Sequence, residues 1–252
     1  MIEDDLRNGH MTNEIWESWL AKLDETNKLL IEREWIEEPF SKETKFYNIR
    51  PGCTDFEIKR IQETNLIRLP DDFIEVATRY SAGLEIARWE CPVKDLPAEY
   101  NGSYLKYHLW RLNGYFSSDP LWEIPDSKDL RWGGPHDTGW STIEDFGEGH
   151  AEYVRIWSKR GYCLNNLGNG DMIAIDLSWE TEAAPVLYFS HDDPDLHGIR
   201  LGYSFIDYID RIISFCCADP EQIAKEAYDS KQHIIDTDKI LKEWKRQLLD
   251  VK

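Results

Sequence analysis

The segments 168–177, GNGDMIAIDL, and 185–192, PVLYFSHD, decide the fold that we expect for this chain. In the first, a glycine turn precedes a run of apolar residues, which predicts a hairpin turn followed by a strand. The second predicts another apolar strand, which ends in a His-Asp loop. A helix with apolar residues on one face is expected to follow from Ser204, its N-cap, to Cys217. Together these segments predict a sheet with a helix packed against it.

Helices are expected before this unit. Apolar residues at helical spacing predict an amphipathic helix over residues 13–38, with Asn13 as its N-cap. A second helix is expected over residues 54–65, where Thr54 and Glu57 have the spacing of a capping box. Its apolar face is predicted to comprise Phe56, Ile58 and Ile61.

The third helix is expected to begin at LPDDF, residues 69–73, and to end in a turn where Gly83 adopts a positive φ. Strands are predicted at residues 84–89, 153–157, 172–177 and 186–189. Residues 91–149 are rich in turn residues and predict strands and loops, with a long surface loop over 130–149. Two further helices are expected, one over residues 221–230 and one after residue 236. The order of helices, strands and helices predicts an α+β fold: a single mixed or antiparallel sheet flanked by helices, with helical additions at both ends.

The charge of the chain restricts its partners. The sequence holds 48 Asp and Glu against 29 Lys and Arg, a net charge of −19. Such a charge repels nucleic acid and anionic membranes and attracts basic partners, so we expect neither a nucleic-acid nor a membrane partner. The 11 tryptophans indicate a core rich in large aromatic side chains. Trp16, Trp19, Trp35 and Trp244 lie on predicted helical faces and are expected in that core.

The cysteines and the N-terminus both favour a cytoplasmic protein. No pair of cysteines has a CxxC spacing, and an odd number without regular spacing indicates free thiols in a reducing compartment. The N-terminus is acidic and lacks an apolar region of the kind that a secretory signal has. The five cysteines are Cys53, Cys91, Cys163, Cys216 and Cys217.

A few groups of residues could carry chemistry, and each also has a structural interpretation. His191, Asp192 and the residues up to His197 could ligate a metal ion with Asp171 and Asp176, but they match no known ligand spacing and also fit a solvated Asp-Pro turn. The pairs His136-Asp137 and Glu148-His150 could act as acid and base, but no nucleophile motif lies near them. The adjacent carboxylates Asp71 and Asp72 are expected by chance in so acidic a chain. We therefore expect no enzyme activity, no metal and no cofactor.

The order of several short motifs resembles that of the SUKH superfamily, which includes a yeast cell-wall regulator and many bacterial immunity proteins. The resemblance covers residues from about 52 to 217, with a long insertion between 89 and 153. It departs from the family at Ser81-Ala82-Gly83, where the family usually has Asn-Gly-Gly. The residues that carry it are Leu69, Pro70, Phe73, Gly83, Gly168, Gly170, Asp171, Asp176, Pro185, His191, Asp192, Ser204 and Phe205.

The resemblance implies a non-enzymatic α+β domain over residues 51–218 with an insertion near 90–150, a helical extension over 1–50 and a helical tail over 219–252. It implies an immunity protein that occludes the active site of a cognate toxin, expected to be a nuclease with a basic surface. Rim carboxylates and two tryptophan anchors are the expected partner-binding residues: Asp126, Asp129, Trp132, Asp137, Trp140, Glu144, Asp145 and Glu148. The alternatives are a regulatory scaffold that binds several partners, and a metal-dependent hydrolase that uses Asp171, Asp176, His191 and Asp192.

Overall fold

The structure is a computed structural model of the 252-residue chain. It describes residues 2–36, 39, 45–65, 67–90, 102–103, 107–111, 161–167, 171–177, 183–190, 196, 198–229 and 234–235. The described helices are α1 (Ile2–Arg7), α2 (Asn13–Glu32), α3 (Asp55–Asn65), α4 (Asp71–Glu75), the π-helix η1 (Val76–Tyr80), α6 (Phe205–Ser214) and α7 (Pro220–Ala227).

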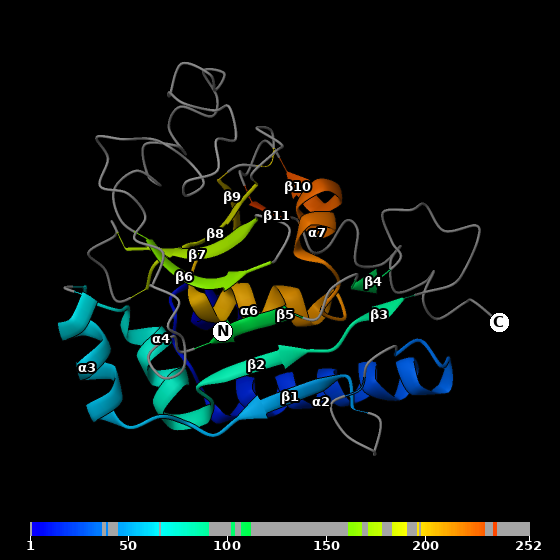
Figure 1. The fold of residues 1–252 in the computed structure, drawn as a ribbon, viewed down its shortest axis with the longest axis horizontal. Coiled ribbons are helices and arrows are strands. Elements are labelled where there is room, and N and C mark those ends of the chain that lie inside the picture. Colours follow the sequence, from blue (N-terminus) through cyan, green and yellow to red (C-terminus); the bar gives the residue numbers. More distant parts are fainter. Residues whose placement is uncertain are drawn as a thin grey trace.

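The described strands are all paired antiparallel, and with the helices they make an α+β fold (Figure 1). One sheet has the order β1-β2-β5, built from Tyr47–Arg50, Gly83–Ile86 and Tyr107–Arg111. A second has the order β6-β7-β8-β9, built from Gly161–Asn166, Met172–Asp176, Val186–Phe189 and Ile199–Gly202. Two short pairs complete the set: β3 (Trp89–Glu90) with β4 (Gly102–Ser103), and β10 (Tyr228–Asp229) with β11 (Ile234–Ile235).

This arrangement differs from the single sheet expected from sequence, although β5 lies against β6. Strands β7 and β8 fall where the apolar runs predict them, whereas β1, β6 and β9 lie where no strand was expected. These strands are short, and their residues mix apolar and polar types, so they carry little periodicity. The predicted strand over residues 153–157 and the helix after residue 236 lie outside the described residues.

Helix α6, amber in Figure 1, is the centre of the fold, because it packs against α1, α2, α4 and β9. Its approach to β9 is so close that a Cβ on Gly202 would collide with the backbone of Tyr208, so only glycine fits there. The main core gathers around this helix and extends from Leu6 to Ile235. The N-terminal helices and the C-terminal strand pair therefore belong to the same core as the middle of the chain. The expected boundary after residue 50 also cuts a sheet, since β1 ends at Arg50 and pairs with β2.

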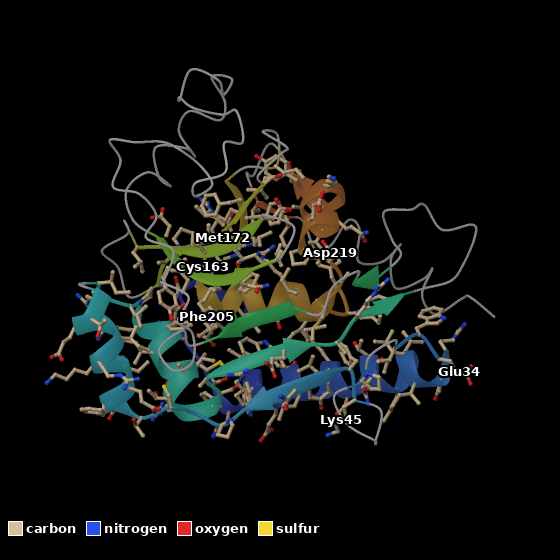
Figure 2. All side chains as sticks on the ribbon, in the orientation of Figure 1. Glu34, Lys45, Cys163, Met172, Phe205 and Asp219 are labelled. Atoms are coloured by element: carbon tan, nitrogen blue, oxygen red, sulfur yellow. The ribbon has the colours of Figure 1, made fainter. Side chains whose placement is uncertain are left out.

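The second sheet is buried on both faces, as the five buried residues of β7 indicate. Ile173 and Ile175 belong to the main core, whereas Met172 and Ala174 lie in a separate cluster on the opposite face of the strand. Cys163 of β6 joins this second cluster, and Figure 2 labels it beside Met172. Pro185 precedes β8, which is an interior strand of this sheet. Its carbonyl accepts a hydrogen bond from Asp176 N at 2.9 Å.

Helix α2 begins and ends differently from the prediction. Its N-cap is Thr12, whose hydroxyl accepts from Ile15 N at 3.2 Å, and not Asn13. The helix ends at Glu32, six residues before the predicted end, in a turn where Glu34 has a φ of 58°. There Trp35 N donates to Leu30 O and Glu34 N to Ile31 O, the pattern of a Schellman motif. The sequence gives no signal for this ending, because the motif usually has glycine where Glu34 stands.

The tryptophan prediction for α2 is confirmed. Trp19 and Trp35 are buried, and Trp16 is partly buried against the same core. Trp244 lies outside the described residues. Large aromatic side chains therefore fill the space between α2 and the rest of the core.

Helices α3 and α4 confirm the predicted capping box and correct two other expectations. Thr54 N donates to Glu57 Oε2 at 2.6 Å, and Glu57 N donates to Thr54 Oγ1 at 3.3 Å. Phe56 is 73% exposed, so it does not share the buried face of Ile58 and Ile61. Gly83 does not provide a positive-φ turn either, because it is the first residue of β2.

Helix α4 continues directly into the π-helix η1, and the segment at Gly52 and Cys53 packs against this π-helix. Cys53 N donates to Ala77 O at 2.8 Å, and a Cβ on Gly52 would lie 2.6 Å from Thr78 O. A π-helix has wider spacing between bonded residues than an α-helix, which leaves carbonyls such as that of Ala77 free for a neighbour. The segment before α3 thus hydrogen-bonds directly to the backbone of η1.

Among the described helices, none combines the length and the apolar character that a membrane crossing needs.

Candidate functional site

None of the expected partner-binding residues falls in the described part of the chain. The rim carboxylates and the two tryptophan anchors all lie between residues 112 and 160: Asp126, Asp129, Trp132, Asp137, Trp140, Glu144, Asp145 and Glu148. The possible acid-base pairs at residues 136–137 and 148–150 lie in the same segment. These assignments remain predictions. The structure does describe many of the residues that carry the family resemblance, and those of segments 69–73 and 204–205 meet at the start of α6.

The motifs at residues 69–73 and 204–205 meet in the core. The rings of Phe73 and Phe205 pack edge to face with centroids 4.9 Å apart. Leu69 and Pro70, which precede Phe73 in the same motif, are also buried. Figure 2 labels Phe205 at the start of α6. Two of the motifs that resemble the family pattern are therefore in direct contact in the fold.

Asp72 joins α4 to the N-terminus of α6. It is 2% exposed; its Oδ1 accepts from Phe73 N and its Oδ2 from Phe205 N, both at 2.8 Å. Burial raises the pKa of Asp72 to about 7, although hydrogen bonds from the N–H groups of Phe205, Phe73 and Ile206 oppose the shift. The expectation that the pair Asp71-Asp72 reflects chance is wrong for Asp72. The signal available in the sequence is its position in a motif between Pro70 and the buried Phe73.

Ser204 adds a second cap at the same helix end. Its hydroxyl accepts from Asp207 N at 2.9 Å, as the N-cap prediction requires, and donates to Leu6 O at 2.5 Å. The side chain of Asp207 returns to accept from the backbone N–H of Tyr203, the residue before the N-cap, at 2.8 Å. The start of α6 thus ties α1, α4 and α6 together through buried hydrogen bonds.

A second buried carboxylate, Asp171, lies just before β7. It accepts a 2.5 Å hydrogen bond from the hydroxyl of Tyr188 on β8, and both side chains are fully buried. Burial, and then the negative charge of Asp171, raise the pKa of Tyr188 far above its ordinary value, so the phenol stays protonated. Nearby, Asp219 caps α7 by accepting from Glu221 N at 2.9 Å, and burial raises its pKa to about 6. The first contact links the segment before β7 to β8, and the second caps α7.

The geometry of β7 argues against the hydrolase alternative. Asp171 and Asp176 are five residues apart along an extended segment, a distance of about 16 Å at the usual rise per residue. Their side chains also alternate to opposite faces of the sheet, so they cannot ligate the same ion. Within the described ranges no three His, Cys, Asp or Glu side chains lie close enough to hold a metal ion. His191, Asp192, Gly168 and Gly170 lie outside those ranges.

The described cysteines are free thiols and show no sign of nucleophilic activation. They are Cys53, Cys163, Cys216 and Cys217, and Cys91 lies outside the described residues. Burial raises the pKa of Cys53 to about 11 and that of Cys163 to about 12, so both stay protonated near neutral pH. Cys216 and Cys217 are buried at the end of α6, as expected for small apolar side chains.

Helix α2 has an acidic face on its exposed side. Helix α2 buries Ile15, Trp19, Leu23, Thr26 and Leu30. Its opposite side exposes five carboxylates, which we call the α2 acidic face: Glu14, Glu17, Asp24, Glu25 and Glu32. Lys28 is the one exposed base of this helix. At 3.6 residues per turn these six residues fall within about a third of the circumference.

In comparisons with known proteins, no family model, no curated protein and no solved structure matches this chain. The resemblance to the SUKH superfamily therefore stays a prediction.

Proposed function

We propose that this chain is a non-enzymatic, cytoplasmic protein-binding domain of the SUKH type. In this proposal it is an immunity protein that neutralises a cognate toxin, a nuclease with a basic surface, by occluding its active site. The observation that carries the proposal is the net charge of −19. A toxin that grips nucleic acid presents a basic cleft, and an acidic inhibitor is complementary to it.

The α2 acidic face supports the same conclusion from described residues. Five exposed carboxylates share one side of a 20-residue helix, and a single exposed base interrupts them. The opposite side of α2 packs into the core beside α6, so the face is held on a rigid element. A rigid array of like charges steers an oppositely charged partner and speeds its capture.

The predicted residues between 126 and 148 have a complementary role in this proposal. Their carboxylates add to the long-range attraction, whereas Trp132 and Trp140 are desolvated in the complex and anchor it. Charge is expected to act mainly on the association rate, and the anchors mainly on the dissociation rate. The two contributions can therefore be separated kinetically.

The first test is co-expression with the product of the neighbouring upstream gene. Host survival would support an immunity role. Co-purification of the two proteins at low salt that is lost at high salt would support capture through complementary charge. If the host does not survive and nothing co-purifies, the immunity role is contradicted.

A second test asks whether the α2 acidic face or only the net charge attracts the toxin. The triple variant Glu17→Lys, Glu25→Lys, Glu32→Lys changes the net charge by six, and so does Asp55→Lys, Glu63→Lys, Asp71→Lys on α3 and α4. We expect the α2 variant to slow association with the toxin about tenfold more than the matched variant at low salt. Equal slowing of both variants would remove the α2 acidic face from the binding surface. In the same assay Trp132→Ala and Trp140→Ala should speed dissociation and leave association unchanged.

A further inference from the structure

Three arginine side chains surround the ring of Tyr203, and they come from three separate elements. The guanidinium carbon of Arg200, on β9, lies 5.2 Å from the ring centroid. That of Arg7, the last residue of α1, lies at 5.4 Å, and that of Arg211, on α6, at 5.9 Å. We call Tyr203 and these three arginines the Tyr203 cluster. The sequence gives no signal for it, because Arg7 is far along the chain from the other members, which lie between residues 200 and 211.

The three arginines do not have equivalent surroundings. Arg211 donates from Nε to Asp207 Oδ1 at 2.9 Å and from a terminal nitrogen to Ile235 O at 2.7 Å. Its role in holding β11 against α6 is therefore structural. Arg200 is different, because its Nε is buried and finds no hydrogen-bond partner within the described part of the chain.

A buried guanidinium nitrogen without an acceptor is costly, since it has lost water and gained nothing in return. Stacking on the Tyr203 ring recovers only part of that cost. Arg200 and Tyr203 are each only partly buried, so part of each side chain is in contact with solvent. An oxyanion that accepted a hydrogen bond from Nε of Arg200 would satisfy that nitrogen and would be attracted by the charge of Arg7, whereas the charge of Arg211 is paired with Asp207.

We propose that the Tyr203 cluster binds a phosphate group, either as free inorganic phosphate or as the phosphate of a small monoester. The planar guanidinium fork matches two oxygens of a phosphate, and a tetrahedral anion can receive donors from several directions at once. The arginines of this cluster come from α1, β9 and α6, so their guanidinium groups reach the Tyr203 ring from three separate elements. This site is independent of the proposed toxin binding.

The size of the ligand follows from the charge of the whole protein. A net charge of −19 repels a long polyanion along its entire length, whereas a single phosphate meets that field at one point only. Local guanidinium groups within a few ångströms outweigh distant carboxylates that salt screens. The cluster is therefore suited to a small phosphate compound and not to nucleic acid.

The experiment is a calorimetric titration of the full chain at pH 7.5 and constant ionic strength. The probes are inorganic phosphate and O-phosphoserine, with chloride as the control anion. We expect saturable binding of one phosphate group, with no saturable binding of chloride. The probe that binds with the higher affinity shows whether the site prefers the free anion or a monoester. Absence of saturable binding by both probes would overturn the proposal.

The variant Arg200→Gln tests the site itself, since the side chain of Arg200 makes no hydrogen bond to the described residues that the fold would lose. We expect it to weaken phosphate binding at least tenfold. The matched control is Arg33→Gln, because the guanidinium carbon of Arg33 lies 5.6 Å from the Trp35 ring at a distant place on α2. That control should bind phosphate as the wild type does. Equal affinity of Arg200→Gln and wild type would exclude this cluster as the site.

Arg200→Lys provides a second variant in case the glutamine variant does not fold. It keeps the positive charge and removes the fork, so its affinity should fall between those of the wild type and Arg200→Gln. Affinity equal to that of the wild type would contradict recognition by the fork of Arg200.

Discussion

The N-termini of α3 and α6 are both capped by side chains, but the capping groups have different origins. At α3, Thr54 and Glu57 cap each other within one turn, and both are in contact with solvent. At α6, the local pair Ser204 and Asp207 is joined by Asp72, which is 133 residues away from Phe205 in sequence. The first cap stabilises one helix; the second fixes the position of a helix in the core. The comparison suggests that the cost of losing a cap depends on what else the cap holds.

The two caps are expected to respond to pH in opposite directions, and the response of Asp72 is the largest effect that we predict. Its pKa is about 7 in the folded protein and about 4 in an unfolded chain. Below pH 4 the carboxyl is neutral in both states and costs nothing. Between pH 4 and 7 the unfolded chain loses the proton first, so the free energy of unfolding falls as pH rises, by about 4 kcal/mol at 1.4 kcal/mol per pKa unit.

This slope can be measured by urea unfolding at several pH values between 4 and 8. Asp72→Asn removes the ionisation with little change of shape and should flatten the slope relative to the wild type. The other titratable groups of the chain contribute equally to the slopes of the wild type and of Asp72→Asn. At α3 the pKa of Glu57 is lowered by hydrogen bonds from Thr54, so its contribution is present above the unfolded pKa and lost as pH falls through the folded one. Identical slopes for Asp72→Asn and wild type would contradict a raised pKa of Asp72 in the folded protein.

Removal of the Asp72 side chain is the next largest effect. Asp72→Ala leaves the N–H groups of Phe73, Phe205 and Ile206 without their acceptor in a buried place. We expect a loss of about 3 kcal/mol in the free energy of unfolding at pH 5. Asp71→Ala is the matched control, because its exposed side chain makes only a 3.8 Å ion pair with Arg68. That control should cost less than about 0.5 kcal/mol. The comparison of the two caps fails if both alanine variants cost the same.

The exposed cap gives the smallest effect. Thr54→Ala removes one acceptor from the start of α3 and should cost about 1 kcal/mol, the usual value for an N-cap. Thr54→Ser keeps the hydroxyl and should unfold at nearly the same urea concentration as the wild type. A loss for Thr54→Ala as large as that for Asp72→Ala would show that α3 holds more of the fold than its contacts indicate.

The difference between the caps also explains how much the sequence could predict. The capping box of Thr54 and Glu57, the cap of Ser204, and strands β7 and β8 depend on neighbouring residues, so the local pattern predicts them. The burial of Asp72 and the two-sheet arrangement depend on residues far apart in the chain. The Tyr203 cluster has the same origin, since Arg7 lies near the N-terminus whereas the other members lie between residues 200 and 211. Glu34 shows a further case, in which packing imposes a backbone conformation that its residue type does not favour.

The long-range bonds of α6 have a consequence for synthesis on the ribosome. Trp19 Nε1 donates to Asp210 Oδ1 and Ser204 Oγ to Leu6 O, over separations of 191 and 198 residues. At an elongation rate of about 5 to 20 residues per second, the N-terminal helices wait roughly ten to forty seconds for their partner. During that time the apolar side of α2 has no α6 to cover it. The nascent chain therefore completes its core only after most of it has left the exit tunnel.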